Sequence, residues 1–141
     1  MYDNSVADRY FSQDHQAFRQ SLRNFVASEV TPNVDKWEAT GRLPRDLYRK
    51  GEMGIQGVLF PEDVGGSDGD FFMQVVVTEE ISRCGAGGVC ASLGSHSIGI
   101  PPVVKHGSDA LRQKFAVPVI AGKRLPRWRS RNPAVDRMWR R

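Results

Sequence analysis

The segment QDHQAFRQSLRNFVASEV, residues 13–30, carries the clearest secondary-structure signal in the chain. Its large apolar side chains are separated by four, seven, eight and twelve positions, which places them on one face of an α-helix. These side chains are Phe18, Leu22, Phe25, Val26 and Val30. Ser12 stands directly before the segment and is a suitable N-cap. The segment therefore predicts an amphipathic helix that packs against a core.

The rest of the chain gives further helical patterns separated by Gly and Pro. Apolar residues from Met73 to Cys84 again share one helical face, although three consecutive valines favour a strand locally. Shorter helices are expected at 45–53, 89–99, 101–107 and 109–115, with a brief extended piece at 55–60 and a loop at 61–69. No pair of alternating strands joined by a hairpin turn is present. The predicted fold class is all-α.

The charges divide the chain into two parts. Residues 1–122 contain 12 Lys and Arg against 15 Asp and Glu, net −3, whereas residues 123–141 contain 8 against 1, net +7. A chain of 141 residues has room for one ordinary domain. We therefore expect a helical domain at 1–122, followed by an Arg-rich tail at 123–141 that is disordered in the isolated chain.

The sequence lacks the residues that several classes of function require. Cys84 and Cys90 have no zinc-finger spacing and the three His residues are scattered, so no metal site is expected. No apolar run is long enough to span a membrane and no signal peptide is recognisable, so a cytoplasmic location is expected. Adjacent Glu79 and Glu80 point about 100° apart on a helix and are interpreted as a solvated face. No catalytic residue is assigned.

Four segments, in this order, resemble one protein family. They are FVASEVTPNVDKWEATGRLP (25–44), EMGIQGVLFPEDVGG (52–66), VVVTEEISRCGAG (75–87) and KHGSDALRQKFAVPVIAGK (105–123). Together they are similar to the N-terminal helical domain of the flavin-dependent acyl-CoA dehydrogenases. The resemblance covers most of residues 1–122 and stops at about residue 123. There a family member would enter a middle β-domain, so a truncated chain with an out-of-frame tail is one hypothesis.

The resemblance implies the chemistry of the intact family. Such enzymes hold FAD and remove hydrogens from C2 and C3 of an acyl-CoA thioester, and an electron-transferring flavoprotein then accepts the electrons. The flavin-binding β-domain and the proton-abstracting carboxylate would both lie outside these 141 residues. We therefore expect this chain alone to hold no FAD, to be inactive, and to self-associate through helical surfaces that lack their partner domains.

One helix is a candidate for substrate contact. Residues 89–99 resemble the family helix that lines the fatty-acyl chain. Their candidate acyl-pocket wall consists of Val89, Cys90, Leu93, Gly94 and Ser97, which share one helical face. An equally weighted alternative is that these residues pack only against another helix. A second hypothesis for the whole chain is a stand-alone helical binding module whose basic tail engages anionic partners, although no specific nucleic-acid binding is expected.

Overall fold

The computed structural model describes residues 9–50, 54–94 and 96–125. Its helices are α2 (Gln13–Phe25), α3 (Val34–Thr40), α4 (Arg45–Lys50), α5 (Phe71–Ser82), α6 (Gly87–Gly94), α7 (His96–Gly99), α8 (Pro101–His106), α9 (Asp109–Leu111) and α10 (Val117–Ile120). Short π-helical or 3-10 turns occur at Val26–Val30, Thr31–Asn33, Glu62–Val64 and Arg112–Ala116. Within the described ranges there is no β-strand, so the all-α prediction is confirmed. The predicted tail lies mostly outside these ranges, at 126–141.

The first turns of α2 and α5 are joined through one histidine. The backbone N–H of Ser12 donates to Nδ1 of His15 at 3.0 Å, so that nitrogen is an acceptor and the ring proton lies on Nε2. Nε2 then donates to Asp70 at 2.9 Å. Asp70 is also the N-cap of α5, because its Oδ1 accepts from the N–H of Met73. A hydrogen bond from His15 and a second from the Met73 N–H lower the pKa of the Asp70 carboxyl.

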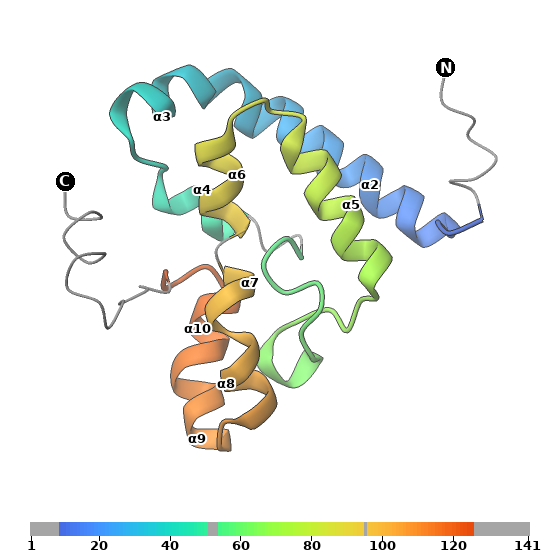
Figure 1. Cartoon of the computed structure of the whole chain (residues 1–141), viewed down its shortest axis with the longest axis vertical. Helices are drawn as coiled ribbons and strands as arrows, with labels where there is room; N and C mark the ends of the chain where they lie inside the picture. Colours follow the sequence, from blue (N-terminus) through green and yellow to red (C-terminus); the bar gives the residue numbers. More distant parts are fainter. Residues whose placement is uncertain (1–8, 51–53, 95, 126–141) are drawn as a thin grey trace.

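Helices α2 and α5 lie side by side and enclose the larger of two hydrophobic clusters (Figure 1). Leu22 from α2, Val30 from the π-helical turn that follows α2, and Val76 from α5 are completely buried in this cluster. Helices α3 and α6 cover one end of it, where Trp37 and Val89 are buried. The apolar residues whose spacing predicted both long helices therefore also pack in the core.

The segment between α4 and α5 folds back on itself. The expected extended piece at 55–60 instead lies in consecutive turns, with the N–H of Gly57 donating to the carbonyl of Gly54 and that of Phe60 to the carbonyl of Gly57. The following loop returns antiparallel to them, and its N–H groups at Asp68 and Gly69 donate to Phe60 and Val58. These turns satisfy the backbone groups locally, which explains why the prediction of an extended piece was wrong.

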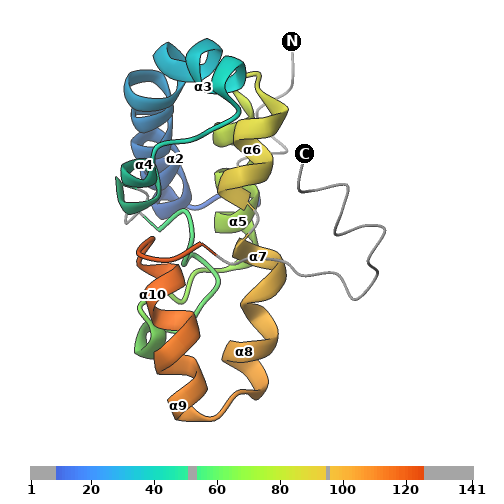
Figure 2. The same cartoon turned by 90° about the vertical axis from the view of Figure 1, so that its left-hand side faces the viewer.

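The second cluster is smaller and lies at the other end of the molecule. It contains Phe60 and Val64 from the segment between α4 and α5, Ile100, and Ala116, Val119 and Ile120 near α10. Figure 2 shows α8, α9 and α10 forming this end, with α7 leading into it from α6. In the described part of the chain, no helix is both long and apolar enough to cross a bilayer.

Candidate functional site

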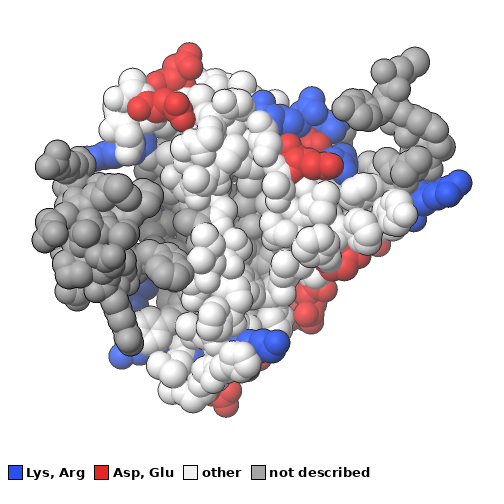
Figure 3. All heavy atoms as spheres, viewed as in Figure 1, with Lys and Arg blue, Asp and Glu red and all other residues white. Residues whose placement is uncertain are grey.

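A cavity of about 370 Å³ lies between the two hydrophobic clusters. Its walls come from the turns at 54–61, from α5, and from the succession α6, α7 and α8. Apolar side chains dominate, among them Val58, Phe60, Val77, Ile81 and Leu93. The volume is near the lower end of the range of about 300–1,000 Å³ that small-molecule sites occupy. Figure 3 shows that the centre of the surface facing the viewer is uncharged, with charged side chains towards its periphery.

The structure places four of the five predicted wall residues on this cavity. Cys90, Leu93, Gly94 and Ser97 line it. Val89 does not line it, because its side chain is only 1% exposed and belongs to the larger core cluster. The predicted helix 89–99 falls on α6 and α7, which the structure describes on either side of residue 95. Contact of these side chains with a substrate stays a prediction.

Sequence reasoning missed the opposite walls of the cavity. Ile55 and Val58 come from the turns after α4, Val77 and Ile81 from α5, and Val104 from α8. The segments of the first four were expected to enter the core, and their apolar character was visible in the sequence. The sequence contains no signal that a cavity separates these residues from α6, because the cavity results from long-range packing of the elements.

Three hydroxyl side chains of the walls donate to backbone carbonyls three or four positions earlier, whereas the buried Oε1 of the wall residue Gln56 has no hydrogen-bond partner among the described residues. Thr78 Oγ1 donates to the carbonyl of Gln74 at 3.0 Å, Ser82 Oγ to that of Thr78 at 2.7 Å, and Ser97 Oγ to that of Gly94 at 2.7 Å. Because each hydroxyl proton is already donated, these groups do not form an activated nucleophile. They present oxygen acceptors beside an apolar space.

Cys90 is the cavity residue with a perturbed thiol. Burial raises the pKa of Cys90, and the neighbouring Cys84 thiol, with its Sγ 3.9 Å away, raises it further. The thiol form therefore dominates at neutral pH, and Cys90 acts as a small apolar wall residue. The described residues that line the cavity include no Asp, Glu or His, so the walls contain no carboxylate or imidazole for proton abstraction. The arrangement can bind and enclose an apolar chain.

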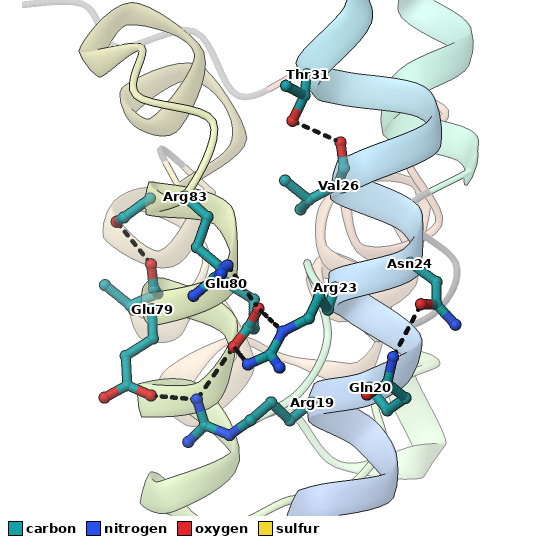
Figure 4. Close-up of polar contacts among 11 residues, drawn as sticks. Arg19, Gln20, Arg23, Asn24, Val26, Thr31, Glu79, Glu80 and Arg83 are labelled. Atoms are coloured by element: carbon teal, nitrogen blue, oxygen red, sulfur yellow. Dashed lines mark hydrogen bonds and ion pairs between the residues drawn. The ribbon is translucent and has the colours of Figure 1, made fainter. Parts of the chain in front are cut away.

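Glu80 lies outside the cavity and departs from the expected solvated face. Its side chain is 1% exposed, whereas that of Glu79 is 51% exposed. Figure 4 shows arginines of α2 reaching Glu80 on α5, with Arg23 Nη2 2.8 Å and Arg19 Nη1 3.2 Å from Oε1. The prediction failed for Glu80 because its partners are 57 and 61 positions away in the chain.

The charge state of Glu80 follows from these contacts. Burial by itself raises the pKa of a carboxyl group, because it disfavours the charged form. In Glu80 the hydrogen bonds from Arg23 and Arg19 and the nearby positive charges outweigh burial, so its pKa is lowered. Glu80 is therefore an ionised structural group that holds α2 against α5. The described residues contain no group of three or more His, Cys, Asp or Glu able to hold a metal ion.

The fold and the cavity thus define a helical domain with an apolar cavity whose described lining residues include no acid–base pair. Residues 12–123 match the family model for the N-terminal domain of acyl-CoA dehydrogenase. The long-chain specific acyl-CoA dehydrogenase of Sus scrofa mitochondria is 35% identical over 116 residues, covering 82% of this chain and 27% of that protein. The short-chain specific enzyme of Clostridium acetobutylicum is 30% identical over 120 residues, covering 84% of this chain and 31% of that protein.

A solved structure gives the same result. The crystal structure of a probable acyl-CoA dehydrogenase from Mycobacterium abscessus superposes with a TM-score of 0.75 and 40% identity, covering 79% of this chain and 30% of that one. The chain belongs to the acyl-CoA dehydrogenase family, and its matched part is the N-terminal domain. It spans less than one third of the length of each of these three relatives.

Proposed function

We propose that this chain forms one wall of the acyl-chain pocket of an FAD-dependent acyl-CoA dehydrogenase. The observation that carries the proposal is the apolar cavity that α6 and α7 share with α5, lined by Cys90, Leu93, Gly94 and Ser97. An acyl chain in this cavity would be shielded from water, and each buried methylene would contribute about 0.8 kcal/mol. The described residues thus orient the chain of the substrate and exclude solvent around it.

The chemical step in this proposal belongs to groups outside the chain. When bound to such an enzyme, FAD accepts the hydride from the β-carbon of the thioester. The described residues do not fit FAD, because the cavity is apolar and only one cationic side chain lines it to balance a diphosphate. The proposal therefore assigns flavin binding, the catalytic carboxylate and contact with an electron-transferring flavoprotein to other segments of an intact enzyme. A cytoplasmic location and self-association also stay predictions.

The length of the acyl chain is left open by the relatives, which include long-chain and short-chain specific enzymes.

The stand-alone binding module, the second hypothesis, depends on the basic tail. Most of that tail lies outside the described residues. No observation in the described part favours the module over the acyl-pocket wall.

The proposal is tested by titrating the full chain with octanoyl-, decanoyl- and dodecanoyl-CoA while recording backbone amide NMR spectra. We expect shifts at Cys90, Gly94 and Ser97, and an affinity that rises by up to about fourfold for each methylene that enters the cavity. Gly94→Leu should weaken binding, because Gly94 lines the cavity and a Cβ there meets no atom within 4 Å.

Gly87→Leu is the matched control. Gly87 is the first residue of the same helix, has equally free space around its Cβ, and does not line the cavity. Equal affinities for the two variants, or shifts confined to residues outside the cavity, would contradict the proposal.

A further inference from the structure

Lys105 is the one charged residue among the described residues that line the cavity. It lies in the last turn of α8, whereas Cys90 lines the cavity from α6. Helices α6, α7 and α8 follow one another along the long axis of the molecule in both views (Figures 1 and 2). The cavity therefore has a cationic side chain near its α8 end and uncharged walls towards α6.

The positive charge of Lys105 is not balanced within the described residues. No hydrogen bond or ion pair joins its ammonium group to them. Two acidic residues near this end of the fold, Asp63 and Asp109, are both paired with Arg112. Lys105 is exposed, so its flexible stem can move its ammonium group without breaking an existing contact.

We propose that the cavity binds an unesterified fatty acid, with the carboxylate on Lys105 and the hydrocarbon chain extending towards Cys90. This inference rests on the proposed role of the cavity as an acyl site and adds the polarity and charge of the ligand. An apolar space with a single cation and no lining carboxylate complements a molecule with one hydrocarbon chain and one anionic group. Because Lys105 is already exposed, its ion pair with the ligand does not require burial of an unpaired charge.

The experiment compares dodecanoate, dodecanol and dodecanoyl-CoA as ligands of the full chain at low and at high ionic strength. Dodecanoate should bind about fivefold more tightly than dodecanol at low salt, and added salt should remove most of this difference. Lys105→Met should abolish the preference for dodecanoate without changing the affinity for dodecanol. Lys105→Arg should keep the preference.

Lys36→Met is the matched control, because it removes the same charge from an exposed residue of α3 that does not line the cavity. A preference that survives in Lys105→Met, or that disappears equally in Lys36→Met, overturns the inference. So does a loss of affinity in Lys105→Met that is seen only for dodecanoyl-CoA, because Lys105 would then contact the phosphates of CoA. If dodecanol and dodecanoate bind equally, the inference fails while the proposed acyl site stands. If none of the three ligands binds, both fail.

Discussion

Replacing Glu80 by Gln tests whether a buried charge holds the two long helices together. The substitution keeps the size of the side chain and one carbonyl acceptor, but it removes the negative charge. In the native protein, Glu80 accepts from Nε of Arg23 at 3.0 Å and from Nη2 at 2.8 Å, a bidentate contact, and also from Arg19. Arg83 adds a third positive charge, with its Nε 3.5 Å from Oε2.

The expected loss of stability depends on how far water can replace the contacts that Glu80 makes. Removing one partner from a fully buried ion pair costs about 3–5 kcal/mol. Here the Glu80 side chain is 1% exposed, but that of Arg23 is 42% exposed and can regain water. Arg19 keeps Glu79 as a second partner. We therefore expect Glu80→Gln to lower the free energy of unfolding by about 2–3 kcal/mol.

Urea denaturation followed by far-UV circular dichroism measures this change. The matched control is Glu79→Gln, which removes the same charge one position earlier from a side chain that is half exposed. That control should cost less than about 1 kcal/mol, because an exposed ion pair contributes little. If both variants unfold at the same urea concentration as the native chain, the burial of the Glu80 charge does not stabilise the fold.

Three further predictions concern stability. The pKa values of the Glu80 and Asp70 carboxyl groups are lowered in the folded chain. The stability that these two groups contribute is therefore complete above the ordinary carboxyl pKa of about 4 and declines as the pH falls towards the lowered values. The urea midpoint should drop between pH 5 and pH 3, and a constant midpoint would contradict this prediction. Gly66→Ala should reduce soluble folded protein sharply, since a Cβ there would lie 1.9 Å from the carbonyl oxygen of Phe60, whereas Gly87→Ala should unfold at an equal or higher temperature than the native chain. Ser12→Ala removes the N-cap of α2 and should cost about 1 kcal/mol in urea titrations, and an unchanged midpoint would show that the cap adds nothing.

The elements that could be predicted from the sequence depend on nearby residues. The helix at 13–30 follows from the spacing of its apolar side chains, and Ser12 caps it as expected. The run of three valines after Gln74 favours a strand locally, yet it lies within α5. Packing against α2 decides the conformation there, because Val76 and Val77 are buried between the helices. Local preference and core burial opposed each other, and burial was stronger.

The features that could not be predicted depend on residues distant in the chain. Nothing in the sequence near Glu80 identifies Arg19 and Arg23 as its partners, so burial of its charge was not foreseen. The face that contains Cys90 and Gly94 could be read from helical spacing. Whether that face met a cavity or another helix was left open, because the answer depends on how α5 and α8 approach it. Val89 illustrates the same difficulty, because it shares that helical face but lies in the larger core cluster.

The position of the cavity between two hydrophobic clusters links ligand binding to the way the molecule unfolds. Ile81 and Leu93 on its walls belong to the larger cluster and Phe60 to the smaller one. A hydrocarbon occupant would touch both and join them into one continuous interior. Since a ligand that binds only the folded state adds its binding energy to stability, the end formed by α8 to α10 would gain protection from amide hydrogen exchange together with the α2–α5 half.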